Sequence, residues 1–482
     1  MNAPALHRLS ATELASRIRS GDVTSVEVVT AHLQQIKRFN PQVQAVVSLR
    51  EEEALREAAE ADTARREGRP MGSLHGVPLT LKDSLRVRGV RSTFGGLPLY
   101  ARHVPRTDAK VAARLRDAGA IVMGRTNLPL LALDWQCNNP FFEECVNPWD
   151  FSRTPGGSSG GSAAALAAGF TPLELGSDLG GSIRYPAHCC GVLGLRTTVG
   201  VLPVDDIGPE GIAMTLERLL SLGPMARTLG DLTLMLDALT GPAAPSVAPA
   251  HLADEKLRIA VTATLPGAAP APSTSALLDT LCASLRADGH TVDVGAAPAI
   301  EMQDAWRVWG LIAGYQYWNG LPALARNRAT RYLFRAYMLR HKLGEGPFEQ
   351  RFSAGMNASR KAYEDALAEQ RAMHAVLDAF FARYALWIMP VSMGEAITRQ
   401  PHGSPIVVDG VAVPYSVYLG AYTVPTTAFE TPVLTMPIGF GAAGMPVGVQ
   451  VHGPRFADRA LLATAERALS KYVTVRTPPA MA

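Results

Sequence analysis

The sequence predicts an α/β fold built on a buried, largely parallel sheet. Residues 77–82 have the short apolar pattern of a strand, residues 108–118 that of a helix ending at Gly119, and residues 120–123 that of a second strand. Alternating strands and helices are typical of parallel sheets that helices cover. The chain has 482 residues, of which 47% are hydrophobic, so it can bury a large core. That length permits two or three domains, or one large α/β domain.

Helices are predicted at the N-terminal end, where two segments match the capping box. In residues 10–13 (Ser-Ala-Thr-Glu) and 24–27 (Thr-Ser-Val-Glu), a hydroxyl and a carboxylate can satisfy free N–H groups of a first helical turn. Apolar residues then recur at helical spacing. Residues 51–66, which are charged and rich in alanine, are predicted as a further, largely solvated helix.

The remaining elements are predicted from shorter patterns in the second half of the chain. In chain order they are a loop at 242–250, a strand at 257–262, a loop at 265–274, mostly helical structure at 301–385, strands at 433–437 and 447–451, and a helix from Asp458.

Charge and cysteine content argue against several classes of function. The 46 basic and 43 acidic residues are interspersed, so neither nucleic acid nor an anionic membrane is a predicted partner. No apolar run approaches the roughly twenty residues of a membrane span, and the N-terminus does not resemble a signal peptide. The five cysteines are odd in number and include no Cys-x-x-Cys. We therefore expect no disulfide framework, no metal site and a cytoplasmic location.

Two glycine-rich turns that carry serines are the strongest functional signal. They lie at residues 156–161 (Gly-Gly-Ser-Ser-Gly-Gly) and 176–184 (Gly-Ser-Asp-Leu-Gly-Gly-Ser-Ile-Arg), on either side of a predicted alanine-rich helix at 162–168. Glycines let backbone N–H groups approach a ligand closely, so the two turns are suited to hold an anionic oxygen beside a serine nucleophile. A nucleotide-binding loop is not indicated, because Gly161 is followed by Ser and Ala rather than by Lys.

A serine nucleophile needs a base, and the sequence offers two candidates. His188 is the histidine nearest to Ser182, but a histidine at such a position is more often packed and hydrogen-bonded than catalytic. Lys82 ends an apolar strand, where burial would lower the pKa of its amine and let it act as a base. Either serine of the first turn could then relay a proton from Ser182. An ordinary ion pair between Lys82 and Asp83 is the alternative.

Longer stretches of the chain resemble a known family. Residues 156–196 resemble the signature of the amidase signature family, and residues 76–83 (Gly-Val-Pro-Leu-Thr-Leu-Lys-Asp) resemble the strand that carries its catalytic lysine. The shorter matches are residues 124–127, 146–150, 223–231 and 445–450. The resemblance covers about residues 8–240 and 380–470, whereas residues 255–380 are not recognisable by motif.

This resemblance implies a central mixed, mostly parallel twisted sheet with helices on both faces and a variable helical insertion. The whole chain, 1–482, is then expected to form one amidase domain. Its expected parts are N-terminal helices (1–70), the signature core (71–240), a variable, mostly helical substrate-channel region (255–380) and the C-terminal part of the core (380–482).

The resemblance also implies the roles of the site residues. Ser182 matches the serine that accepts the acyl group, Lys82 the general base, and Ser158 a relay serine held in a cis peptide conformation. The N–H groups that match the oxyanion hole are those of Leu179, Gly180, Gly181 and Ser182. The implied reaction is hydrolysis of a carboxylic amide through an acyl-enzyme, with no metal or organic cofactor.

Departures from the family pattern bear on the substrate. Leu179 stands where many members have Thr, and with residues 135–141 it is similar to the fatty acid amide hydrolase branch. Tyr185 stands where the tRNA-dependent transamidase subunit usually has Gln. The chain thus resembles the stand-alone aryl and fatty amide hydrolases more closely. We expect small-molecule substrates such as apolar or aryl amides, anilides or carbamates (urethanes), with esterase or urethanase side activity.

Residues 301–340 are rich in aromatic side chains, among them Trp306, Trp309, Tyr317 and Trp318. Aromatic residues at helical spacing usually belong to the core, but these could also wall an apolar substrate pocket. Two other functions stay open, a subunit of a glutamine-dependent tRNA amidotransferase and a non-catalytic scaffold. Members of the family are often dimers, so a homodimer is open as well.

Overall fold

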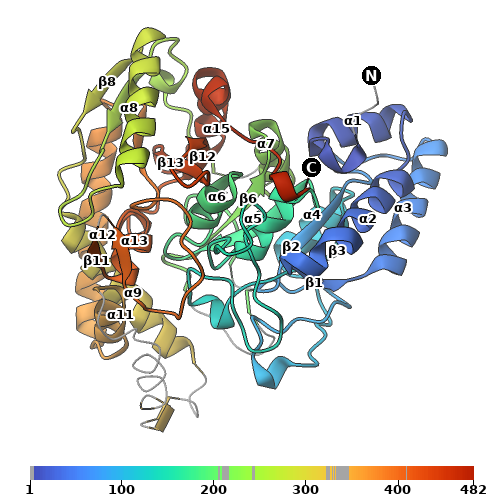
Figure 1. Ribbon diagram of the computed structural model, residues 1–482, viewed down its shortest axis with the longest axis horizontal. Coiled ribbons are helices and arrows are strands. Elements are labelled where there is room, and N and C mark those ends of the chain that lie inside the picture. Colours follow the sequence, from blue (N-terminus) through green and yellow to red (C-terminus); the bar gives the residue numbers. More distant parts are fainter. Residues whose placement is uncertain are drawn as a thin grey trace.

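A computed structural model describes residues 5–204, 207–208, 216–240, 245–321, 326–327, 329–330, 332, 347–408 and 410–481. Within them, an 11-stranded sheet runs from the N-terminal helices at one end of the molecule to β8 at the other (Figure 1). In order across the sheet, the strands are β1 (Val46–Leu49), β3 (Ile121–Thr126), β2 (Pro78–Lys82), β4 (Leu173–Asp178), β6 (Ser221–Ala226), β5 (Leu193–Arg196), β12 (Val433–Phe440), β13 (Pro446–His452), β9 (Leu386–Pro390), β7 (Arg258–Val261) and β8 (Thr291–Val294). A separate hairpin pairs β10 (Ile406–Val408) with β11 (Val411–Val413).

The α/β class and the mixed sheet are confirmed. Strand β2 pairs in parallel with β3 and β4, and β7 pairs in parallel with β8 and β9. The strands between these two blocks, and β1 at the edge, pair antiparallel. The centre of the sheet is therefore less parallel than the alternation of strands and helices predicts. Antiparallel neighbours need no crossover helix, and β12 and β13 are joined by a tight turn at 441–445.

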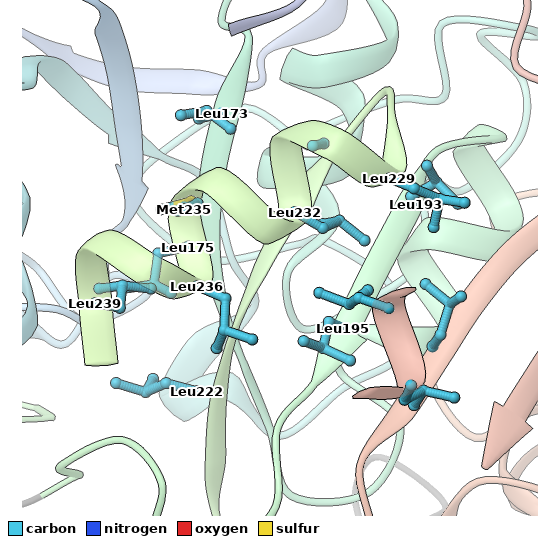
Figure 2. Packing of buried hydrophobic residues seen from close by; sticks show 14 of the residues in the cluster. Leu173, Leu175, Leu193, Leu195, Leu222, Leu229, Leu232, Met235, Leu236 and Leu239 are labelled. Carbon is cyan, nitrogen blue, oxygen red and sulfur yellow. The ribbon is translucent and has the colours of Figure 1, made fainter. Parts of the chain in front are cut away.

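One face of the sheet lies against a large apolar cluster. The helices on this face are α1 (Ala11–Ser20), α4 (Lys110–Asp117), α7 (Leu229–Thr240), α8 (Pro272–Ala287) and α15 (Asp458–Leu469). Figure 2 shows the centre of the cluster, where the leucines of α7 and Met235 lie over leucines from β4, β5 and β6. Alternate residues of several strands enter this cluster, as Leu79 and Leu81 do from β2 and Leu173 and Leu175 from β4.

Helices also cover the opposite face, as expected. One apolar cluster there joins α2 (Ser25–Val43), α3 (Glu51–Arg66), α5 (Gly160–Ala167) and α6 (Arg184–Cys190). A second, more aromatic cluster joins α9 (Met302–Gly320), α11 (Pro347–Met356), α12 (Arg360–Phe381), α13 (Tyr415–Gly420) and α14 (Val424–Thr427). Short 3-10 helices occupy Leu6–Arg8, Pro98–Tyr100, Leu130–Ala132, Ala250–Leu252, Ser470–Tyr472 and Pro479–Met481.

Local sequence signals account for several helix boundaries. Ser10 and Thr24 cap α1 and α2 in complete capping boxes, as predicted. The predicted bounds of α3 and the start of α15 at Asp458 are also confirmed. The predicted loop at 265–274 is wrong at its end, because Pro272 opens α8 at the first helical position, where proline needs no N–H partner.

The alanine-rich helix also starts earlier than predicted. Helix α5 begins at Gly160, two residues before the predicted start, because Ser159 is its N-cap and accepts the first helical hydrogen bond. Structure at 301–385 is mostly helical in its described part, as predicted, whereas residues 333–346 and 241–244 lie outside the described residues.

The cysteines and the character of the helices can also be compared with the sequence-based expectations. The five cysteines, all within the described ranges, are buried free thiols. No helix in the part of the chain that the structure describes has both the length and the apolar character needed to cross a membrane.

Candidate active site

Three segments bring the predicted site residues together on the face of the sheet opposite the α7 cluster. Strand β2 ends at Lys82, and its Thr80 pairs with Glu174 of β4 on the same face. The first glycine turn leads from Ser158 directly into α5. The second turn connects β4 to α6 and contains Ser182. The main chain joins the two turns, since the N–H group of Ser159 donates to the carbonyl of Ser182 over 3.1 Å.

The Lys82 amine lies within a ring of serine hydroxyls. Its Nζ is 2.7 Å from Oγ of Ser158, 2.9 Å from Oγ of Ser159 and 3.0 Å from Oγ of Ser177. Lys82 is fully buried. The alternative ion pair with Asp83 does not form, because that carboxylate pairs with Arg125 at 2.9 Å. The peptide bond between Gly157 and Ser158 is cis.

Burial changes the protonation of Lys82. It lowers the pKa of the amine from its ordinary value of 10.5 to about 7, because water no longer stabilises the ammonium form. The negative charges of Asp178 and Glu174 act in the opposite direction. Burial also raises the pKa of Glu174 to about 7. A lysine with such a pKa is partly neutral near pH 7 and can accept a proton.

Ser182 is partly exposed and lines a pocket, whereas Lys82 and Ser158 are buried and are not among its lining residues. The side chains and backbone that line the pocket belong to Ala132, Leu133, Asp134, Trp135, Leu179, Gly180, Ser182, Trp309 and Phe348. Its wall is aromatic, because the ring of Phe348 lies 4.9 Å from that of Trp135 and 4.8 Å from that of Trp309. The Asp134 carboxylate already has two polar partners, because it contacts His402 at 2.6 Å and accepts a hydrogen bond from Tyr415.

Side chains from other segments hold the carbonyl groups of the second glycine turn. The indole N–H of Trp309 donates to the carbonyl of Leu179 over 2.7 Å. The carbonyl of Gly180 accepts from the Thr423 hydroxyl at 3.2 Å and, more weakly, from the indole N–H of Trp135 at 3.4 Å. A carbonyl and the N–H group of the same trans peptide point in opposite directions, so these contacts also orient the N–H groups of the turn.

Those N–H groups are not all available for a ligand. Gly181 donates its N–H to Oδ1 of Asp178 at 2.8 Å. For Leu179, Gly180 and Ser182, no acceptor of the backbone N–H is found among the described residues. All three residues line the pocket, so an oxygen bound there has up to three N–H donors within the turn.

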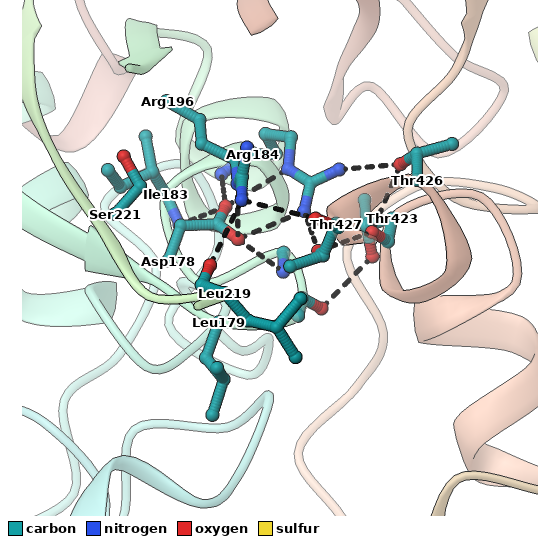
Figure 3. A network of polar contacts seen from close by, with 12 residues as sticks. Asp178, Leu179, Ile183, Arg184, Arg196, Leu219, Ser221, Thr423, Thr426 and Thr427 are labelled. Atoms are coloured by element: carbon teal, nitrogen blue, oxygen red, sulfur yellow. Dashed lines mark hydrogen bonds and ion pairs between the residues drawn. The ribbon is translucent and has the colours of Figure 1, made fainter. Parts of the chain in front are cut away.

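Asp178 fixes the base of this turn (Figure 3). Its carboxylate accepts from the N–H groups of Gly181 and Ile183 and forms a bidentate pair with Arg184, at 2.9 and 3.0 Å. Arg196 lies 3.7 Å away. Burial alone would raise the pKa of Asp178, but the two guanidinium groups hold it well below its usual range. Arg184 also donates to Thr426, Thr427 and Gln450, which ties the turn to the C-terminal part of the fold.

Of His188 and the four aromatic residues singled out from the sequence, only Trp309 lines the pocket that contains Ser182. His188 is buried and hydrogen-bonded to the backbone of Gly394 and Gly448, and burial lowers its pKa to about 4, so it is packed as predicted. Of the four aromatic residues, Trp309 lines the pocket, Trp306 borders a separate cavity, and Tyr317 and Trp318 pack in the aromatic cluster.

Sequence reasoning missed several parts of the site. Ser177 contacts Lys82, and its place in the motif at residues 176–184 was the available signal, although no role was predicted for it. Phe348 and Thr423 come from distant segments and carry no local signal. Among the described residues, no group of three or more His, Cys, Asp or Glu side chains is arranged to hold a metal ion.

Comparisons with known proteins identify the family. Residues 27–462 match the amidase family. The chain is 32% identical to a subunit of the glutamyl-tRNA(Gln) amidotransferase of Moorella thermoacetica, over 95% of this chain and 96% of that protein. It is 30% identical to an acylamidase of Rhodococcus erythropolis, over 95% of this chain and 94% of that protein. The crystal structure of a peptide amidase from Stenotrophomonas maltophilia matches with a TM-score of 0.77 at 28% identity, over 98% of both chains.

The two kinds of relative are about equally similar, so the predicted closeness to stand-alone hydrolases stays a prediction. The family itself does not depend on that choice, because the match spans nearly the whole chain and the fold agrees over the same length. The protein belongs to the amidase signature family of amide hydrolases.

Proposed function

We propose that this chain acts alone on neutral, apolar substrates, hydrolysing aryl or medium-length acyl amides, anilides or carbamates through an acyl-enzyme on Ser182. The observation that carries the proposal is the buried Lys82 amine, 2.7 Å from Ser158 and with its pKa lowered to about 7. A neutral amine in that place is a base connected to a hydroxyl relay.

The reaction then proceeds in two halves. Ser182 Oγ attacks the substrate carbonyl while its proton passes to Ser158 and the proton of Ser158 passes to Lys82. The resulting oxyanion is held by the N–H groups of Leu179, Gly180 and Ser182, whereas the predicted donor Gly181 gives its N–H to Asp178. As the C–N bond breaks, the proton returns through Ser158 to the leaving nitrogen. Water then attacks the ester carbonyl of the acyl-enzyme while Lys82 and Ser158 take up a proton from it. The relay returns that proton to Ser182 Oγ as the ester C–O bond breaks, which releases the acid and restores the serine.

The substrate class follows from the pocket wall. Trp135, Trp309 and Phe348 present aromatic surface, and Leu179 adds an aliphatic side chain beside Ser182. Among the described lining residues, Asp134 is the one charged side chain, and it is already paired with His402. A charged group brought into the pocket would lose water without gaining a partner, which disfavours polar metabolites. The similarity to an acylamidase supports the same class.

A first experiment tests the catalytic roles. Ser182→Ala and Lys82→Met should each lower kcat/KM for an anilide by at least about 1,000-fold, since residues of one relay act as a unit. Ser162→Ala is the matched control, because this buried serine directly after the first glycine turn bonds Thr126 rather than Lys82. Activity within about tenfold of wild type in a folded Ser182→Ala or Lys82→Met variant contradicts the proposal.

A second experiment tests the substrate class. The specificity constant for an acetanilide-type substrate should exceed that for a short aliphatic amide of the same acyl group, because the leaving aryl ring can pack against the aromatic wall. A clear preference for the small polar amide would contradict the proposed specificity and leave the catalytic roles intact.

The similarity to an amidotransferase subunit supports a second candidate, glutamine hydrolysis that supplies ammonia to a partner. Free glutamine carries an ammonium and a carboxylate, and the described pocket lining offers no cation for that carboxylate. We therefore expect the purified chain to hydrolyse anilides without added subunits and to release little ammonia from glutamine. The reverse pattern would favour the amidotransferase.

A further inference from the structure

We propose that Trp309 is a positioning residue for the oxyanion hole, acting through the carbonyl of Leu179 rather than by touching the reacting atoms. This inference rests on the proposed function, because it concerns the N–H groups that would bind the oxyanion. It assigns a catalytic effect to a side chain of the variable helical region, which the sequence marks only as a core or pocket aromatic.

The second glycine turn is flexible by composition. Residues 179–182 (Leu-Gly-Gly-Ser) form three successive peptide units, and Gly181 has a positive φ of 109°. Peptide planes flanked by glycine rotate easily, because no Cβ restricts the neighbouring dihedral angles. A preorganised oxyanion hole therefore needs each plane to be held by a contact from outside residues 179–182.

Each of the three planes has such a contact, but the contacts differ in kind. The plane between Gly181 and Ser182 is held by backbone, since Tyr185 donates its N–H to the carbonyl of Gly181 at 2.8 Å. The plane between Gly180 and Gly181 is held at both ends, by Thr423 at the carbonyl and by Asp178 at the N–H group.

The remaining plane, between Leu179 and Gly180, depends on Trp309. Among the described residues, its indole N–H is the one donor to the carbonyl of Leu179, and no acceptor binds the N–H of Gly180 at the other end. At 2.7 Å this is a short hydrogen bond for an N–H donor. Trp309 thus sets the direction of the Gly180 N–H, one of the three N–H groups of the turn that are available to an oxyanion.

The surroundings of Trp309 make it a rigid support. Its side chain is fully buried, and its ring lies 4.8 Å from that of Phe348 and 6.1 Å from that of Phe352. The same ring lines the pocket. A phenyl ring at position 309 would keep most of this packing and remove only the N–H donor. The substitution therefore separates the effect on the orientation of the Leu179–Gly180 peptide from the effect on the pocket wall.

Trp309→Phe is therefore the test, with an anilide as substrate. Losing one net hydrogen bond corresponds to a rate decrease of about 2- to 13-fold, and losing an oxyanion donor completely corresponds to a decrease of roughly 100- to 1,000-fold. We expect a loss between these two estimates, so kcat should fall by about 3- to 30-fold. KM should stay within about twofold of the wild-type value. The pKa of the ascending limb of the pH–rate profile should not move, because Lys82 keeps its contacts.

Two further measurements separate positioning from a structural role. A trifluoromethyl ketone adds to Ser182 and places an oxyanion in the hole, so its affinity should fall by the same factor as kcat/KM. Binding of the unreacted anilide, measured by titration of Ser182→Ala with and without Trp309→Phe, should stay within about twofold. If Trp309→Phe folds poorly, a tryptophan analogue with sulfur in place of the indole N–H, incorporated at position 309, gives the same comparison without change of shape.

Trp306→Phe is the matched control. It lies one turn earlier on α9, and its indole N–H has no described hydrogen-bond partner, so kcat and inhibitor affinity should be unchanged. Equal kcat and inhibitor affinity in folded Trp309→Phe and wild type would overturn the inference, as would a loss confined to anilide binding. Full activity of Ser182→Ala would instead overturn the proposed function, so the two failures are distinguishable.

Discussion

Replacing Asp178 with asparagine should destabilise the fold strongly, even though the side chain barely changes in size. Both carboxylate oxygens accept hydrogen bonds from N–H donors, Oδ1 from Gly181 and Arg184 and Oδ2 from Ile183 and Arg184. Whichever way an asparagine side chain is rotated, its amide NH2 faces at least two N–H donors. Arg184 and Arg196, both fully buried, lose their counter-charge as well.

The magnitude follows from these contacts. Removing one partner of a buried ion pair costs about 3–5 kcal/mol, because the remaining charge is left without compensation. The upper end applies here, since two guanidinium groups share this one carboxylate. We therefore expect Asp178→Asn to lower the free energy of unfolding by about 4–5 kcal/mol.

The pH dependence of this loss is also fixed. The folded-state pKa of Asp178 lies below its ordinary value of 3.8, so its contribution to stability is complete above that value and declines only as the pH falls toward the lower folded value. The difference between wild type and Asp178→Asn should thus be constant from about pH 5 to pH 9.

Urea unfolding followed by circular dichroism at about pH 5, 7 and 9 measures this difference. Glu60→Gln serves as a matched control, because its pair with Arg56 is more than half exposed and should contribute less than about 1 kcal/mol. A loss below about 1 kcal/mol for Asp178→Asn, or a loss that disappears at about pH 5, would refute the reasoning.

Three further predictions concern the site and the first helices. The pH–rate profile for kcat/KM should rise with an apparent pKa of about 7. Glu174→Gln should shift that rise to lower pH, because loss of the negative charge destabilises the Lys82 ammonium. A shift to higher pH would show that another group limits the rate. Gly181→Ala should lower kcat at least about tenfold, since the new Cβ would lie 2.4 Å from Oγ1 of Thr423 at a positive φ, and near-normal turnover in a folded variant would contradict this. Thr24→Ala should reduce the free energy of unfolding by about 1 kcal/mol through loss of the α2 capping box, and thermal unfolding that matches wild type would count against it.

Local patterns in the sequence were sufficient for many elements of the fold. The capping boxes at Ser10 and Thr24, the helix at 51–66 and the strand that ends at Lys82 each depend on residues within one short window. Pairing direction at the centre of the sheet was not predictable in this way. It depends on which distant strands become neighbours, as β12 does between β5 and β13.

The same limit applies to the candidate site. Lys82, Ser158 and Ser182 lie in motifs that the sequence displays, and the structure brings Lys82 and Ser158 into contact. The groups that orient the turn do not lie in motifs. Trp309 is 130 residues from the carbonyl it binds, and Thr423 is 243 residues from the carbonyl it binds. A hydrogen bond between such distant residues leaves no periodic or compositional trace in a single sequence.

The alternation of side chains along β2 has a consequence for how this protein tolerates change in length. Leu79 and Leu81 enter the apolar cluster under α7, and Thr80 and Lys82 point to the opposite face. Inserting or deleting one residue within the strand would exchange the two faces, placing the amine in hydrocarbon and a leucine among the serines. A substitution in β2 changes the size or polarity of one side chain, whereas a shift by one residue moves every shifted side chain to the other face of the sheet. Alignments of relatives should therefore show substitutions but no single-residue gaps between residues 78 and 82.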